Sequence, residues 1–161
     1  MNIFSHSSLP YPETDGIMRD PSLISSIAAA RLSELGDISD YIYFGLMLDG
    51  SYPGLSELFE KMAMTEMRHF GILGKMIICL GGDPAVRTRH SNPFYGKPER
   101  IDCPAVKRIV SGALESEQAA MKNYLKLAAS TSDKAASALL ERIAADEEHH
   151  ARMLSRALED M

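Results

Sequence analysis

Apolar residues recur every three or four positions along four stretches of the 161-residue chain. This period gathers them on one face of an α-helix and leaves polar residues on the other. No stretch has the strict alternation of apolar and polar residues that predicts a β-strand, so the expected fold class is all-α. The predicted helices run from about Asp20 to Gly50, Ser51 to Gly82, Asp102 to about Ala129, and about Asp133 to Leu158.

The segments between these helices predict how they are arranged. The first two helices are almost contiguous at Gly50 and Ser51, and the turn at 130–133 is also short, so each pair should form an antiparallel hairpin. The segment from Gly82 to Asp102 has no helical period and is long enough to cross a bundle from end to end. We therefore expect one domain over residues 21–161, a four-helix bundle of two antiparallel helix hairpins joined by a long crossover.

Residues 1–20 show no helical period and contain Pro10, Pro12 and Gly16. Proline in this number interrupts regular structure because it fixes φ and lacks an N–H donor. We expect an extended N-terminal arm that lies on the bundle, fastened by the aromatic side chains of Phe4 and Tyr11.

A glutamate and a histidine lie within the apolar stripe of the second predicted helix. Glu66 and His69 are three residues apart, so they lie on one helical face, and that face is otherwise apolar. Burying an ionised carboxylate costs several kcal/mol unless it is paired, protonated or bound to a metal ion. The stripe therefore predicts a partner for this pair; its other members are Leu55, Leu58, Phe59, Met62, Leu73, Met76 and Leu80.

The fourth predicted helix repeats this step with Glu147 and His150. His149 is adjacent but shares its face with Arg142, Asp146, Arg152 and Arg156, which reads as a solvated face. His150 shares the apolar face with Glu147 and is the candidate for the site.

Each step is preceded by an inward glutamate and a tyrosine seven residues after it, Glu34 with Tyr41 and Glu117 with Tyr124. The spacing from Glu34 to Glu66 is 32 residues and from Glu117 to Glu147 is 30, so the chain contains an internal repeat of a helix pair.

This ordered set of residues resembles the ferritin-like dimetal-carboxylate proteins, and within them the rubrerythrin and bacterioferritin branch. The resemblance covers roughly residues 21–159 and implies a ferritin-like four-helix bundle that binds two metal ions at its centre. It implies one carboxylate from each of the first and third helices and a Glu-x-x-His step from each of the other two. The metal ligands are then Glu34, Glu66, His69, Glu117, Glu147 and His150.

The chemistry of these side chains agrees with that expectation. Four carboxylates balance two divalent cations, and oxygen ligands with one imidazole per metal suit iron, or alternatively manganese, better than structural zinc. Glu66 and Glu147 should bridge the ions, with Glu34 and Glu117 as terminal ligands. Positions left open would accept dioxygen or hydrogen peroxide.

Residues around the ligands are expected to support them. A metal-bound histidine usually donates its other ring N–H to an acceptor, and Asp146 is the candidate, on its own helix or across to His69. Thr65 is the equivalent residue of the first repeat. Tyr41 and Tyr124 are expected to hydrogen-bond the carboxylates and are the candidates for a catalytic role; simple core tyrosines are the alternative.

The resemblance implies an oxidoreductase that acts on peroxide or dioxygen. Rubrerythrins carry a second glutamate one turn away on the third helix, whereas Leu114 and Ala120 stand on either side of Glu117 here, with Asp37 a weak substitute. The chain has no rubredoxin-like tail of paired cysteines, so a peroxidase would need a separate electron-donor protein. Ferritin-type iron oxidation and storage, manganese catalase-like peroxide dismutation and a structural metal site remain alternatives.

The composition of the chain limits the kinds of binding partner to be expected. A net charge of −5 and a pI near 5.5 give no basic surface for nucleic acid or an anionic membrane, and no apolar run is long enough to span a bilayer. Cys79 and Cys103 lack metal-knuckle spacing, and residues 1–8 lack the basic start and the continuous apolar region of a secretory signal. We expect a soluble, cytoplasmic homodimer with reduced thiols.

Overall fold

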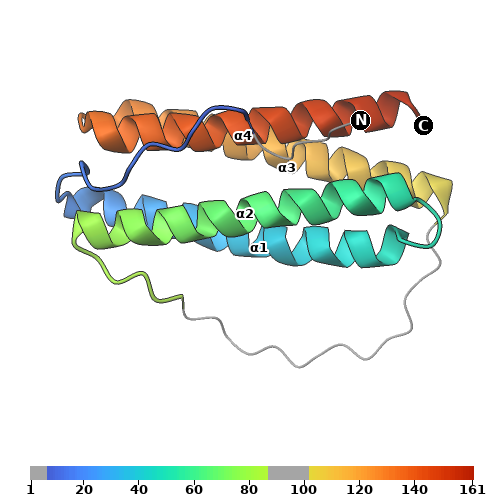
Figure 1. The fold of residues 1–161 in the computed structure, drawn as a ribbon, viewed down its shortest axis with the longest axis horizontal. Coiled ribbons are helices and arrows are strands. Elements are labelled where there is room, and N and C mark those ends of the chain that lie inside the picture. The colour runs from blue at the N-terminus through green and yellow to red at the C-terminus, as the bar shows by residue number, and fades with distance from the viewer. Residues whose placement is uncertain (1–6, 87–101) are drawn as a thin grey trace.

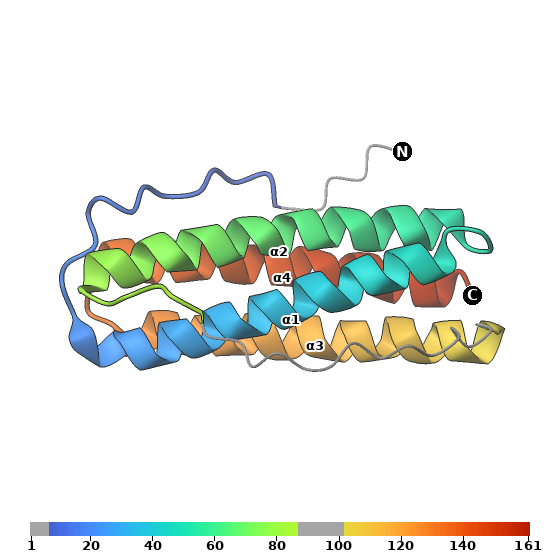
Figure 2. The ribbon, with the colours of Figure 1, turned by 90° about the horizontal axis from the view of Figure 1, so that it is seen from below.

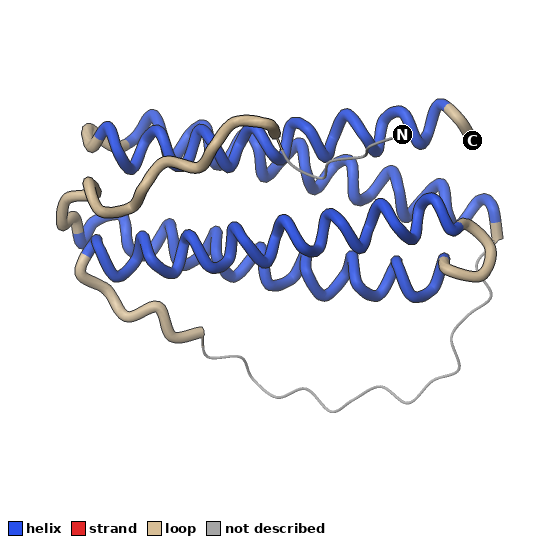
Figure 3. Tube along the Cα trace, viewed as in Figure 1, coloured by secondary structure: helices blue, strands red, loops and turns tan. Residues whose placement is uncertain are grey.

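The computed structural model describes residues 7–86 and 102–161, which form four long helices and contain no strand (Figure 1). Figure 3 shows how little of the described chain lies outside helices. The helices are α1 (Ile24–Leu48), α2 (Pro53–Leu80), α3 (Cys103–Ser130) and α4 (Lys134–Glu159), and a 3-10 turn, η1 (Pro21–Leu23), precedes α1. The all-α prediction is confirmed, and the helix limits lie within a few residues of those expected.

Local sequence signals set the helix ends. Asp102 accepts a hydrogen bond from the Ala105 N–H at 2.8 Å, and Asp133 accepts from two N–H groups at the start of α4. These caps satisfy backbone donors that have no partner within the helix. Gly81 ends α2 with a φ of 94°, a left-handed conformation that glycine adopts without a steric penalty.

The helices form two antiparallel hairpins. α1 and α2 are joined by a short turn and pack together, as do α3 and α4 (Figures 1 and 2). α2 ends at one end of the bundle and α3 begins at the opposite end, as the predicted crossover requires. Residues 87–101 of that crossover lie outside the described part of the chain. The hairpins meet with α1 beside α3 and α2 beside α4 (Figure 2).

Two apolar clusters occupy the interior, one toward each end of the bundle. One includes Leu73, Leu139 and Ile143, and the other includes Phe59 and Val110. The candidate ligands lie between them in sequence along every helix, so the polar side chains form a layer within a close-packed core. Such a layer holds its geometry because packed side chains on both sides limit movement.

The N-terminal arm is described from Ser7 onward, and residues 7–20 contain no helix. In Figure 1 the arm runs along α4 toward the start of η1. Asp133 accepts a hydrogen bond from the Met18 N–H at 2.6 Å, and the Cys79 thiol lies 3.6 Å from the Thr14 carbonyl. The arm is therefore attached to both hairpins. Phe4, expected to help fasten it, lies outside the described residues.

No helix in the described ranges is long and apolar enough to cross a membrane.

Candidate metal centre

Four helices bring the six expected ligands together at the middle of the bundle. Each of the six side chains is at most 3% exposed. α1 contributes Glu34, α2 Glu66 and His69, α3 Glu117, and α4 Glu147 and His150. The inward face of each helix is otherwise apolar, so folding the hairpins together places these polar groups opposite one another.

The six side chains form two overlapping sets, in each of which one ligand atom per residue lies within 4.8 Å of the others. Glu66 and Glu147 belong to both sets. Each set also contains one terminal glutamate and one histidine, and the sets are Glu34, Glu66, His69, Glu147 and Glu66, Glu117, Glu147, His150. This arrangement suits two cations that share two carboxylates.

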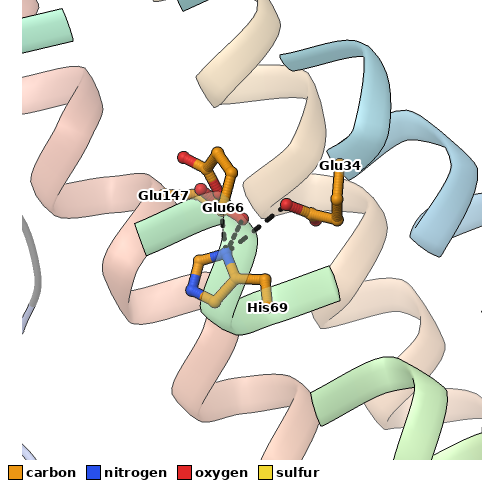
Figure 4. Close-up of side chains that lie close together, drawn as sticks. All are labelled: Glu34, Glu66, His69 and Glu147. Carbon is orange, nitrogen blue, oxygen red and sulfur yellow. Dashed lines mark hydrogen bonds and ion pairs between the residues drawn. The ribbon is translucent and has the colours of Figure 1, made fainter. Parts of the chain in front are cut away.

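His69 directs its Nδ1 atom toward the first set, as Figure 4 shows. Nδ1 lies 2.8 Å from Glu66 Oε2, 3.3 Å from Glu147 Oε1 and 3.5 Å from Glu34 Oε2. A nitrogen surrounded by three carboxylate oxygens is placed to share a cation with them.

His150 repeats this geometry in the second set. Its Nδ1 atom lies 2.9 Å from Glu66 Oε1, 3.1 Å from Glu117 Oε2 and 3.4 Å from Glu147 Oε2. The adjacent His149 is partly exposed and belongs to neither set. Helical phase therefore separated the two histidines correctly.

Hydrogen bonds from the tyrosines cross between α1 and α3. The Tyr41 hydroxyl on α1 donates to Glu117 Oε1 on α3, and the Tyr124 hydroxyl on α3 donates to Glu34 Oε1 on α1. Both phenols are buried, and burial beside carboxylates raises their pKa, so they stay protonated and act as donors. The prediction that these tyrosines bond the carboxylates is confirmed. Each terminal glutamate keeps its other oxygen turned toward the ligand set.

The other ring nitrogen of His69 meets Asp146, as expected for one of the two possible arrangements. Nε2 lies 3.0 Å from Asp146 Oδ2, across from α2 to α4. Two hydrogen bonds from the arm and an ion pair with Arg142 also reach Asp146. Because burial opposes ionisation but these donors outweigh it, the pKa of Asp146 is well below its usual range. An ionised Asp146 fixes the tautomer that leaves Nδ1 available.

Burial and neighbouring charges shift the pKa values of several ligand side chains. Burial, together with the charges of Glu147 and Glu66, raises the pKa of Glu34 to about 8. Burial also raises the pKa of Glu117 well above its usual value. The pKa of each ligand histidine is raised: burial lowers it, but the surrounding carboxylates outweigh that effect. Burial raises the pKa of Glu66, but the charges of His150 and His69 outweigh that effect and lower it below its usual value.

Two carboxylate oxygens lack a hydrogen-bond partner. Oε1 of Glu66 and Oε1 of Glu147 are buried and make no hydrogen bond to the described residues. Glu66 Oε1 lies 2.9 Å from His150 Nδ1, without the alignment that a hydrogen bond requires. Buried polar atoms of this kind are rare and need a reason. Both belong to the shared glutamates, so the residues present fit two bound cations.

The expectation of a solvated face is wrong for Arg142 and Asp146, both of which are buried. Nη1 of Arg142 lies 2.7 Å from Asp146 Oδ1. The guanidinium also donates to the carbonyls of Ser7 and Leu9, so the arm covers it. Helical phase correctly placed Arg142 outside the bundle interior but could not reveal that another segment covers that face. Of the other residues expected to be solvated, Arg152 is exposed and pairs with Glu148.

Two other acidic residues near the centre, Glu115 and Asp37, are in neither ligand set. Glu115 is exposed and lies outside both ligand sets, as expected. Asp37 is half-buried beside α3, where its Oδ1 lies 3.4 Å from the Ser116 hydroxyl. Burial and the charges of Glu66 and Glu147 raise the pKa of Asp37 to about 7. The charges of the ligand glutamates therefore act on Asp37, although Asp37 is in neither ligand set.

A bundle of this topology with two overlapping carboxylate–histidine sets defines a ferritin-like dimetal-carboxylate protein. The chain belongs to the rubrerythrin family, whose sequence model matches residues 26–158. No curated protein resembles the chain closely enough to count as a match.

Solved structures with this fold include three bacterioferritins. That of Desulfovibrio desulfuricans, described with its diiron site in different catalytic states, is 27% identical, with 86% of this chain and 78% of that chain covered and a TM-score of 0.71. Bacterioferritin BfrA of Mycobacterium tuberculosis is 26% identical over 90% and 89% of the two chains, with a TM-score of 0.63. That of Rhodobacter capsulatus, described with a metal-free dinuclear site and a haem iron, is 22% identical over 89% and 87%, with a TM-score of 0.72, and supports the fold alone.

Proposed function

We propose that the protein is a dimetal oxidoreductase that binds two iron ions and oxidises Fe(II) with hydrogen peroxide or dioxygen. The observation that carries the proposal is the pair of buried glutamates, Glu66 and Glu147, that belong to both ligand sets. The likeness to a bacterioferritin with a diiron site supports iron as the metal. Manganese is the alternative metal, because the same donors suit both ions.

The ligand residues would bind and orient the cations. Four carboxylates match the charge of two divalent ions, and each histidine adds one nitrogen, which leaves room for an oxidant. Tyr41 and Tyr124 hold the terminal glutamates in place through the oxygens that face away from the centre. The protons of Glu34 and Glu117 must leave when the ions bind, because a metal ligand has to be deprotonated.

The proposed reaction balances with peroxide as oxidant. Two Fe(II) ions lose one electron each, and hydrogen peroxide takes up both electrons and two protons to give two water molecules. When bound, each of the two iron ions would supply one of the two electrons. The surrounding apolar clusters exclude bulk water from the buried layer, which limits release of partly reduced oxygen species.

Membership of the rubrerythrin family favours a second candidate, reduction of peroxide with electrons from a separate donor protein. Leu114 and Ala120 argue against the rubrerythrin form of this chemistry, because neither can supply the additional carboxylate next to Glu117. A manganese catalase-like reaction would need no donor, since peroxide serves as both oxidant and reductant.

The oligomeric state distinguishes an enzyme from an iron-storage protein, because a dimer encloses no space for a mineral. We propose a homodimer formed through α1 and α2. Large apolar side chains are exposed on both helices, with Leu46 70% exposed, Met64 57% and Tyr43 53%. Exposed apolar groups of this size are typical of protein interfaces when they gather on one face. The solution mass tests this, and a hollow many-chain particle would favour storage.

The decisive experiment is anaerobic loading of the metal-free protein with Fe(II), followed by elemental analysis and stepwise addition of hydrogen peroxide. We expect two irons per chain and Fe(III) absorbance that saturates at one peroxide for every two irons. Failure to bind iron or manganese would overturn the dimetal centre. Binding without oxidation by peroxide or dioxygen would leave a structural site.

A further inference from the structure

Asp146 is unusual among the buried carboxylates because the arm supplies two of its partners. The Ser7 N–H donates to Oδ1 at 2.5 Å, and the Tyr11 hydroxyl donates to Oδ2. Arg142 Nη1 lies 2.7 Å from Oδ1, and His69 Nε2 lies 3.0 Å from Oδ2. Asp146 itself is 0% exposed. One oxygen is thus shared by Tyr11 and the ligand histidine, and the other by Ser7 and Arg142.

Tyr11 contacts this network with its ring as well as its hydroxyl. The ring lies edge-on to the His69 imidazole, with centroids 6.3 Å apart. The Arg142 guanidinium lies over the ring at 4.1 Å from its centroid, and that of Arg68 lies at 5.5 Å. Cations over an aromatic face hold it electrostatically. Tyr11 is therefore fixed between α2 and α4 directly outside His69.

Arg142 fastens the arm at the same place. Its Nε donates to the Leu9 carbonyl at 2.6 Å and its Nη2 to the Ser7 carbonyl at 3.1 Å. The same guanidinium thus joins the arm backbone to Asp146. A planar donor group with several N–H directions suits this simultaneous binding, which lysine could not reproduce.

The two halves of the repeat differ at this point. Thr65 is the residue equivalent to Asp146, so a neutral hydroxyl stands where the second repeat has a carboxylate. The Thr65 hydroxyl lies 3.4 Å from the Lys61 carbonyl of its own helix. The charged network that includes the arm therefore serves the histidine of α2 and is not repeated in the same form for the histidine of α4.

We propose that the N-terminal arm is a working part of the metal centre, in which Tyr11 and Arg142 are positioning residues that hold Asp146 against His69. The two metal positions are then inequivalent: Tyr11 and Arg142 control how firmly the ion beside His69 is held, and the equivalent position 65 carries a threonine in place of the aspartate. This inference rests on the proposed dimetal centre, and it adds the arm and the inequivalence to it.

Removing the Tyr11 hydroxyl isolates this role. Tyr11→Phe keeps the ring and its packing but takes away the donor that fixes Asp146 Oδ2. Loss of the group that directly hydrogen-bonds a ligand commonly weakens metal binding 10–100-fold. Tyr11 acts one step further out, through Asp146, so its loss should have an effect at or below the lower end of that range. Tyr52→Phe is the matched control, because Tyr52 lies at the partly exposed turn before α2 and belongs to neither ligand set.

The first measurement uses Co(II), whose absorbance reports its coordination. The metal-free wild type, Tyr11→Phe and Tyr52→Phe are loaded anaerobically, and release of the bound Co(II) is followed after adding excess chelator. We expect two ions per chain in all three proteins. In Tyr11→Phe one of the two ions should leave faster, by up to about tenfold, and the other at the wild-type rate. In a His69→Ala background, Tyr11→Phe should leave release of the remaining ion unchanged.

The second measurement needs no metal. Long-range proton–nitrogen spectra of the histidine rings resolve the His69 Nε2–H that Asp146 accepts. This proton should exchange slowly with water in the wild type and in Tyr52→Phe, and markedly faster in Tyr11→Phe. A purely structural role of the arm would leave it protected once circular dichroism shows equal helicity.

The outcomes separate the inference from the proposed function. Wild type that binds two ions and Tyr11→Phe that releases both at wild-type rates would overturn the role of the arm alone. Equal acceleration at both positions would also overturn it, because the arm would then act on the whole fold. A wild type that binds no Co(II) would overturn the dimetal centre itself, and the inference with it.

Discussion

The buried hydroxyl of Tyr124 on α3 donates a hydrogen bond to Glu34 on α1, and the hydroxyl of Tyr41 on α1 donates an equivalent bond to Glu117 on α3. These two bonds tie the hairpins together on the α1–α3 side of the bundle. They also occupy one oxygen of each terminal glutamate. The centre and the association of the hairpins therefore depend on the same residues.

Replacing Tyr124 with phenylalanine should destabilise the metal-free protein. The change leaves a carboxylate oxygen of Glu34 buried without its donor, which typically costs about 1–3 kcal/mol. We expect the free energy of unfolding in urea, measured with chelator present, to fall by that amount. Tyr52→Phe, at the partly exposed turn before α2, is the control and should change little. Equal stability of the three proteins would contradict the structural role of this bond.

Replacing Glu66 with alanine should remove both metal ions, because its carboxylate belongs to both ligand sets. Glu34→Ala removes a ligand of one set only and should leave one ion bound. Glu115→Ala, on the exposed face of α3, should retain two. Elemental analysis of each purified variant after anaerobic loading measures this. Two ions bound to Glu66→Ala would refute the bridging assignment.

The two adjacent histidines of α4 should behave differently. His150→Ala removes the only imidazole of its ligand set and should lower the metal content from two ions to one. His149→Ala changes a partly exposed side chain outside both sets and should keep two ions and the wild-type oxidation rate. If His149→Ala lost an ion instead, the assumed phase of α4 would be wrong.

Stability and metal affinity should respond to pH in opposite directions. Between pH 4.5 and about 8, metal-free folded Glu34 keeps a proton that the unfolded chain has lost, so the folded state binds more protons. The melting temperature of the metal-free protein should therefore fall from pH 6 to pH 8, and the raised pKa values of His69 and His150 add to the fall.

Over the same range, metal affinity should rise by up to about tenfold per pH unit for each proton displaced. Glu66 and Asp146, whose pKa values are lowered, stay ionised throughout and contribute no slope. Thermal unfolding with and without Mn(II) at several pH values measures both trends. A stabilisation by metal that does not grow with pH would contradict the protonation state assigned to Glu34.

The periodicity predicted the metal centre because the buried face of a helix can be inferred from that helix's own sequence. A glutamate inside an apolar stripe, such as Glu34 or Glu117, must face the core whichever helices surround it. Phase also separated His150 from His149, since neighbouring residues on a helix point about 100° apart. Two pairs of such stripes with nearly equal spacing, 32 and 30 residues, then implied that the ligands meet.

The sequence could not predict what the arm covers. Arg142 lies on the polar face of α4, and its burial arises from Ser7 and Leu9, more than 130 residues earlier in the chain. The arm has no period from which its path could be inferred. The pairing of Tyr41 with Glu117, and of Tyr124 with Glu34, likewise depends on which hairpins are adjacent, and spacing within one helix carries no such information.

The internal repeat allows something that two identical hairpins could not have. A symmetric pair of separate hairpins would carry the same residue at each equivalent position, so any support given to one metal ion would be given to the other. Joining the hairpins in one chain lets position 65 be a threonine and position 146 an aspartate. The crossover thereby frees the two halves of a near-symmetric centre to specialise.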